Sequence, residues 1–133
     1  MPMQSKNFIR NAARLEAFGV GLYESFQRKA TEYWKEWLRI YLPMERNHWR
    51  IWNEMETERH VHTAFYKSGI LTGKILSIFW GPQCILTIKL IEKFAVKGYR
   101  HVSKDPALSG DIRRNAERIL KDEIDMDLMA SKR

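Results

Sequence analysis

Residues 43–52 read PMERNHWRIW and contain the spacing Glu45-x-x-His48. A carboxylate and an imidazole three residues apart lie on the same face of an α-helix. Such a pair is half of a metal site if other parts of the chain supply partners. Otherwise it is an ordinary pair on a solvated helix.

The two halves of the chain repeat one arrangement of acids and tyrosines. Each half has a glutamate, a tyrosine seven residues later and a second glutamate after about 30 residues: Glu16, Tyr23 and Glu45, then Glu92, Tyr99 and Glu123. The second glutamate opens Glu45-x-x-His48 in the first half and Glu123-x-x-Met126 in the second half. The pair in PMERNHWRIW therefore has candidate partners elsewhere in the chain.

The periodicity of the apolar residues is helical, and no run alternates with period two between turn signals. It predicts helices over about 5–29, 31–59, 64–102 and 107–130. Ser5 is expected to cap the first helix, and Ser109 or Asp111 the last. Pro43 should kink or restart the second helix, and Gly81-Pro82 should break the third.

Two hairpins built to the same plan, residues 5–62 and 64–131, can pack as a four-helix bundle within a single domain spanning residues 1–133. Each hairpin would then place one lone glutamate and one Glu-x-x-His-type pair in the core, which is the ligand arrangement of carboxylate-bridged di-iron proteins. Iron in such sites is bound by oxygen and imidazole donors. If four acids are buried without a metal, either their carboxyl groups take up protons or the bundle is destabilised.

On these residues the chain resembles the demethoxyubiquinone hydroxylases of ubiquinone biosynthesis, a family of the ferritin-like carboxylate-bridged di-iron superfamily. The family's first motif is similar to Glu16 followed by Leu22-Tyr23, and its second matches Glu45-x-x-His48. Its glycine-bearing apolar helix, which ends in a ligand glutamate, resembles residues 69–92, and its last motif resembles residues 121–126. The similarity covers roughly residues 10 to 130.

The resemblance implies an all-α, ferritin-like four-helix bundle that holds two iron ions. Five side chains would be the ligands: Glu16, Glu45, His48, Glu92 and Glu123. Tyr23 and Tyr99 are expected to pack in the core, with a hydrogen bond to a ligand carboxylate as the functional alternative. The implied reaction is the O₂-dependent hydroxylation of a ubiquinone precursor, a quinone-like small molecule, at the matrix side of the mitochondrial inner membrane. Reducing equivalents would come from outside, since no flavin or nicotinamide motif is present.

Two departures from the family lead to a rival hypothesis. Met126 stands where a sixth ligand, a histidine, is expected, and a thioether is a poor ligand for oxidised iron. Asp125 and Asp127 flank Met126 but lie off its helix face. Arg14 near an iron site would alter the charge of that site. The rival is a degenerate, non-catalytic accessory subunit of a respiratory-type complex of the mitochondrial inner membrane.

Residues 68–91, SGILTGKILSIFWGPQCILTIKLI, carry only Lys74 and Lys89 as charges and are long enough to cross a bilayer. Three interpretations are open: a core helix whose outer face touches a membrane, which we favour, a helix lying in the membrane interface, and a single span. Gly81-Pro82 in the middle of the run would break the helix, and Lys74 and Gln83 within the run argue against a simple lipid-facing span.

The chain has a net charge of +7 and a pI near 9.7, so it suits an acidic partner. A membrane surface or an inner-membrane protein complex fits better than nucleic acid, because no dense block of Lys and Arg occurs. The single cysteine, Cys84, excludes a disulfide framework and a Cys-based zinc site. No secretory signal is expected at the N-terminus, which is weakly similar to a mitochondrial presequence, although the start of the first helix is the favoured interpretation.

Overall fold

A computed structural model describes residues 2–56 and 62–133, and within these ranges the protein is helical with no strand. The elements in chain order are α1 (Met3–Phe26), a 3₁₀ turn η1 (Gln27–Lys29), α2 (Glu32–Met55), α3 (Thr63–Trp80), a 3₁₀ segment η2 (Gly81–Leu86), α4 (Thr87–Val102) and α5 (Gly110–Ala130). The predicted all-α class is therefore confirmed, with four helices packed together.

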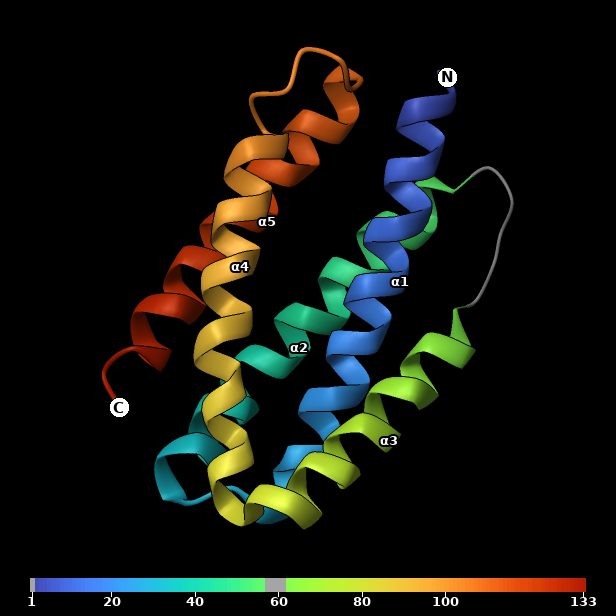
Figure 1. Ribbon diagram of the computed structural model, residues 1–133. Coiled ribbons are helices and arrows are strands. Elements are labelled where there is room, and N and C mark those ends of the chain that lie inside the picture. Colours follow the sequence, from blue (N-terminus) through green and yellow to red (C-terminus); the bar gives the residue numbers. More distant parts are fainter. Residues whose placement is uncertain (1, 57–61) are drawn as a thin grey trace.

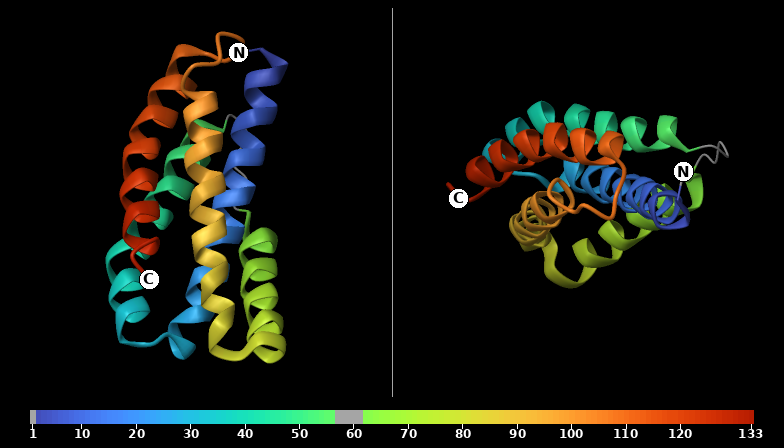
Figure 2. Two further views of the ribbon diagram at one scale, coloured as in Figure 1. Left: turned by 60° about the vertical axis from the view of Figure 1, so that its left-hand side comes forward. Right: turned by 90° about the horizontal axis from the view of Figure 1, so that it is seen from above.

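The helices associate mainly in pairs. α1 packs against both α2 and α3, and α4 packs against α5, while α2 and α5 make a smaller contact. Viewed along the helices in Figure 2, α2 and α5 lie on one side, α1 and α4 lie next to them, and α3 lies on the far side. The bundle is thus formed by α1, α2, α4 and α5, and α3 is an additional helix packed on α1.

The stretch predicted as one broken helix over 64–102 is two helices that run in opposite directions (Figure 1). The chain turns at Gly81, whose φ of 57° is readily adopted only by glycine, and Pro82 follows at the start of η2. The predicted break at Gly81-Pro82 is confirmed. The apolar run 68–91 consequently folds back on itself.

α1 and α3 approach each other closely because glycines face each other across the contact. A Cβ atom added to Gly21 would lie 2.1 Å from the carbonyl oxygen of Tyr66, and one added to Gly69 would lie 2.1 Å from that of Phe18. Small residues four positions apart, here Gly69 and Gly73, commonly allow such backbone contact between helices. The contact fixes α3 on α1 without a layer of side chains between them.

The structure differs from two of the sequence predictions about helix starts and breaks. Ser5 is not an N-cap, because α1 already begins at Met3; its buried hydroxyl instead accepts a hydrogen bond from the backbone N–H of Ser109 at 3.4 Å. Pro43 does not restart α2, which is continuous around it. The predicted end of that helix near residue 59 lies outside the described residues. Ser109 does cap α5, as expected, by accepting from the N–H of Ile112.

The apolar core consists of two clusters separated along the helices. One cluster includes Phe26, Trp37, Leu38 and Met126, and the other includes Ile9, Trp52, Ile112 and Ile119. The buried acids occupy the helix turns between these two clusters. Apolar packing above and below them holds the acidic level of the bundle in place.

Candidate metal centre

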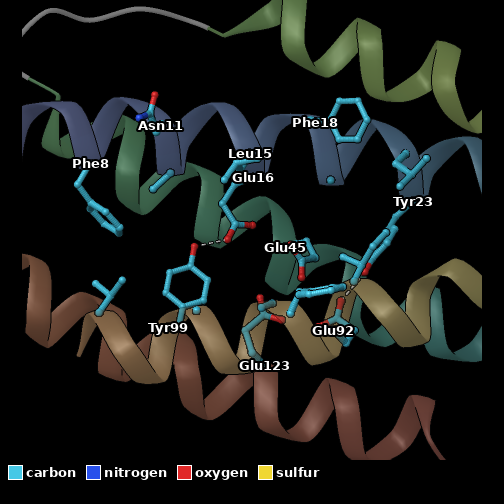
Figure 3. A pocket seen from close by; sticks show the side chains of 18 residues that line it. Phe8, Asn11, Leu15, Glu16, Phe18, Tyr23, Glu45, Glu92, Tyr99 and Glu123 are labelled. Carbon is cyan, nitrogen blue, oxygen red and sulfur yellow. Dashed lines mark hydrogen bonds between the residues drawn. The ribbon is translucent and has the colours of Figure 1, made fainter. Parts of the chain in front are cut away.

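Four buried side chains from three helices meet at the acidic level of the bundle. Glu16 comes from α1, Glu45 and His48 from α2, and Glu123 from α5; each offers one ligand atom, and these atoms all lie within 4.8 Å of one another. The carboxylates point toward the space between α1 and α4 (Figure 3). This buried group could hold a metal ion.

Glu92, the fifth expected ligand, lies beside this group but outside it. It comes from α4 and is completely buried. One of its oxygens accepts a hydrogen bond from the hydroxyl of Tyr23, and the other has no hydrogen-bond partner among the described residues. The structure thus brings together four of the five expected ligands and places the fifth at the edge.

The two tyrosines of the repeated arrangement bind the glutamates reciprocally. Tyr23 on α1 donates to Glu92 on α4, and Tyr99 on α4 donates to Glu16 on α1 (Figure 3). The hydroxyl of Tyr99 also accepts a hydrogen bond from the indole N–H of Trp52 at 3.0 Å. Tyr23 packs in the core, as expected, and both tyrosines also make the hydrogen bond that was given as their functional alternative.

His48 has one ring nitrogen directed away from the glutamates and one directed at them. Nε2 lies 2.8 Å from a carboxylate oxygen of Asp122. Nδ1 lies 3.0 Å from a carboxylate oxygen of Glu123, yet it has no hydrogen-bond partner, so this approach lies off the direction of a ring N–H. When Nε2 donates to Asp122, the lone pair of Nδ1 faces the carboxylates. This is the orientation in which a histidine binds a metal.

Asp122 is the residue of the site that the sequence analysis did not identify. It was noted only as part of the stretch 121–126 that resembles the family's last motif, and no role in the site was assigned to it. A signal was available in the comparison of the two halves: Asp122 precedes Glu123, whereas Met44 precedes Glu45. A carboxylate before one glutamate and a thioether before the other predict that the two glutamates have different neighbours in the site.

Burial and mutual repulsion disfavour ionisation of these acids. Burial is the main cause that raises the pKa of Glu45 well above its ordinary value, followed by the charges of Glu16 and Glu92. Burial likewise raises the pKa of Glu123 and, to a smaller extent, of Glu92. In the absence of a cation these carboxyls therefore tend to hold protons, and a metal ion would replace those protons.

The residues that distinguish the chain from the family also have defined places. Met126 is completely buried in the apolar cluster of Phe26 and Trp37. As expected, its neighbours point elsewhere: Asp125 accepts from the hydroxyl of Tyr41 at 2.9 Å, and a carboxylate oxygen of Asp127 lies 3.6 Å from the ammonium of Lys93. Neither aspartate supplies the ligand that the resemblance led us to expect at position 126.

Arg14 is directed at α3. Its guanidinium carbon lies 5.1 Å from the centre of the Phe65 ring, in a cation–π arrangement. Its Nε has no hydrogen-bond partner among the described residues. The positive charge therefore rests on the α1–α3 contact and makes no ion pair with the glutamates within the described part of the chain.

A cavity of about 520 Å³ leads from the surface to the carboxylates between α1 and α4. Glu16, Glu45, Glu92 and Glu123 line it at depth, and its other walls are largely apolar. Leu15 on α1 and Phe94 on α4 also line it, and each is 72% exposed. The acidic group is thus reached through an opening framed by exposed apolar side chains.

The exposed surface of α3, η2 and α4 is apolar and basic. Exposed apolar side chains on α3, η2 and α4 include Leu71, Ile75, Ile78, Phe79, Trp80, Leu86, Leu90 and Phe94. Residues 63–104 contain seven Lys and Arg residues. The same stretch has one acidic residue, Glu92, and this side chain is buried. Within the described residues, one stretch, Thr63–Val102, is long and apolar enough to cross a membrane, and 28% of its most apolar window is buried.

No family model, no curated protein and no solved structure matches the chain.

Proposed function

We propose that this chain is a metal-binding helical protein of a membrane surface that receives an apolar ring compound at its carboxylate–imidazole group. One observation carries the proposal: four buried residues offer ligand atoms within 4.8 Å of one another, and the three glutamates among them line a cavity whose opening is apolar. The resemblance to demethoxyubiquinone hydroxylases implies that the metal is iron and the compound a ubiquinone precursor.

The residues of the centre have distinct roles in this proposal. Glu16, Glu45, His48 and Glu123 would hold the metal, and bound iron would supply the activation of O₂. The hydroxyl of Tyr99 fixes the orientation of Glu16, and Asp122 fixes that of His48. Leu15 and Phe94 would enclose the ring compound and exclude water from the carboxylates.

Attachment to a membrane would follow from the surface of α3, η2 and α4. Large exposed apolar side chains insert into the boundary between the lipid headgroups and the acyl chains. The excess of Lys and Arg over acids in residues 63–104 would be attracted to anionic lipids. An apolar compound could then pass from the bilayer into the cavity. The matrix side of the mitochondrial inner membrane is the location that the resemblance implies.

Iron analysis and product analysis test this function. Protein produced with added iron should retain the metal after gel filtration. Supplied with O₂ and an external electron donor, the loaded protein should add one oxygen atom of O₂ to a short-chain ubiquinone precursor, while the other oxygen atom leaves as water. A Glu45→Gln, Glu123→Gln variant is the control, since it keeps the shape of the centre. Absence of retained iron in the parent protein would refute the proposal.

Attachment to lipid is tested separately by flotation. The protein should float with vesicles containing an anionic lipid, and replacing Ile78 and Phe79 by serine should reduce the floating fraction without changing the helical circular dichroism signal. Equal flotation of the parent protein and this variant would contradict the assigned surface.

The second candidate function is the non-catalytic accessory subunit of an inner-membrane complex. Met126 favours it, because the thioether occupies the position of an expected histidine ligand and lies in the apolar core. Under this hypothesis the protein folds without iron and co-purifies with membrane proteins through the apolar surface. Retained iron together with ring hydroxylation would exclude it.

A further inference from the structure

We propose that the centre binds a single metal ion, on the side of His48, and that the side of Met126 does not complete a site for a second ion. This inference rests on the metal binding proposed above, but it differs from the two-iron centre that the resemblance implies. It follows from comparing corresponding positions in the two halves of the chain.

The two halves correspond in their contacts at the level of the glutamates. Tyr23 of the first half binds Glu92 of the second, and Tyr99 of the second half binds Glu16 of the first. Each tyrosine lies seven residues after the glutamate of its own half. Positions with the same spacing in the two halves can therefore be compared directly.

The correspondence ends at the histidine. His48 lies three residues after Glu45, and its Nε2 contacts Asp122, which immediately precedes Glu123. In the second half, the position three residues after Glu123 is 126, and the position immediately before Glu45 is 44. If the two halves corresponded fully, the side chain at 44 would therefore orient a histidine at 126. Both positions are methionine, and both side chains pack with the same apolar cluster. An imidazole and its carboxylate partner in one half are thus replaced together by two apolar side chains in the other.

The positions of the potential ligands also differ between the His48 side and the Met126 side of the centre. The four residues whose ligand atoms lie within 4.8 Å of one another include His48, whose buried Nδ1 lies 3.0 Å from a carboxylate oxygen of Glu123 and has no hydrogen-bond partner. Glu92 is not in this group, and one of its oxygens is occupied by Tyr23. On that side a second ion would find Glu92 and shared carboxylates but no imidazole, because position 126 is a methionine that packs in the apolar cluster.

The number of ions retained per chain tests the inference directly. Apo-protein is dialysed anaerobically against excess Fe²⁺, passed through a desalting column and analysed for iron and protein. We expect one retained ion per chain. Two retained ions would overturn the inference, whereas none would overturn the metal binding on which it rests, so the two failures are distinguishable.

Variants that exchange the two sides sharpen the test. His48→Met makes the first half like the second and should weaken ion binding by more than about 100-fold, since even losing the partner of a ligand histidine costs about 10–100-fold. Met126→His combined with Met44→Asp restores the corresponding pair and should raise the retained number to two. Met126→Leu is the packing control and should leave one ion.

Electron paramagnetic resonance of Mn²⁺-loaded protein provides a readout that does not depend on activity. An isolated Mn²⁺ ion gives a resolved hyperfine pattern, while two ions bridged by a carboxylate give a spectrum broadened by exchange coupling. We expect the isolated pattern in the parent protein and in Met126→Leu, and the coupled spectrum in the Met44→Asp, Met126→His variant. A coupled spectrum in the parent protein, or undiminished binding in folded His48→Met, would contradict the assignment.

Discussion

The hydroxyl of Tyr99 donates a hydrogen bond to Glu16 and thereby joins the last turn of α4 to the middle of α1. Tyr23 makes the opposite connection from α1 to Glu92 on α4. The cavity lies between the same two helices. The two tyrosines therefore connect the walls of the cavity through the acids at its base, so that packing, proton binding and metal binding are coupled there.

Replacing Tyr99 by phenylalanine should destabilise the apo-protein and weaken its metal binding. The change leaves Glu16 without this donor and the indole N–H of Trp52 without its acceptor. We expect a loss of about 1–3 kcal/mol in the free energy of unfolding, because buried polar groups become unpaired. Urea unfolding with a chelator present measures this loss.

Tyr33→Phe is the matched control, since the Tyr33 hydroxyl donates to the carbonyl oxygen of Met129, away from the glutamates. It should lower stability while leaving metal affinity unchanged. A Tyr99→Phe protein with the affinity of the parent protein would show that the hydrogen bond to Glu16 does not support ligand geometry.

The apo-protein should become less stable as the pH rises above the ordinary carboxyl pKa of 4.5. Burial raises the pKa values of Glu45 and Glu123 in the folded state, so the folded protein binds more protons than the unfolded chain in this range. The stabilisation is complete below the unfolded pKa and is lost as the pH passes through the folded pKa values, with a slope of about 1.4 kcal/mol per pH unit for each proton.

Thermal unfolding across this pH range, with a chelator present, measures the slope. The Glu45→Gln, Glu123→Gln variant should have a smaller slope because its amides do not titrate. Metal should reverse the trend in the parent protein, since protons compete with the ion for the carboxylates. A parent protein that gains stability toward neutral pH without metal would contradict the folded-state pKa directions.

Asp122→Asn should weaken metal binding by about 10–100-fold, because the amide is a poorer acceptor for Nε2 of His48 and orients the ring less well. Isothermal titration of the apo-protein with Fe²⁺ under anaerobic conditions measures the change. Asp125→Asn is the control: this aspartate is also on α5, but it accepts from Tyr41. Equal affinities of the two variants would exclude a specific role for Asp122.

Gly69→Ala should separate α1 from α3 and destabilise the protein by about 3 kcal/mol or more, since the new methyl group would overlap the backbone of Phe18. Chemical unfolding measures the loss. Gly98→Ala is the control within another helix, where a Cβ meets nothing within 4 Å, and it should be neutral or stabilising by up to about 1 kcal/mol. Similar losses in both variants would contradict a close-contact role for Gly69.

The parts of the structure that could be predicted are those for which the sequence carries a periodic signal. Helical spacing predicted the all-α class, and the repeated Glu and Tyr positions identified the acids that meet in the core. The break at Gly81-Pro82 was predicted because glycine and proline act locally. The repeat showed Asp122 only as a difference from Met44, and its role depends on a contact between α2 and α5 that sequence spacing does not reveal.

The position of α3 was not predicted for a related reason. The apolar run 68–91 was interpreted through its hydrophobicity, which does not distinguish core, interface and membrane. Its packing on α1 depends on the facing of Gly21 and Gly69, two positions far apart in the chain. The spacing Gly69-x-x-x-Gly73 was the available signal, but it does not specify the partner helix.

The glycine contact between α1 and α3 also has a mechanical consequence. Backbone touches backbone there, so these two helices are expected to move as one rigid body, because no side chain can change rotamer to let them slide. The opposite wall of the cavity is α4, which is packed on α5 and connected to α3 through the corner at Gly81. We therefore expect the entrance to widen by a hinge motion of α4 together with α5 about that corner. The two Tyr–Glu hydrogen bonds between α1 and α4 oppose this motion and must break before the entrance can open.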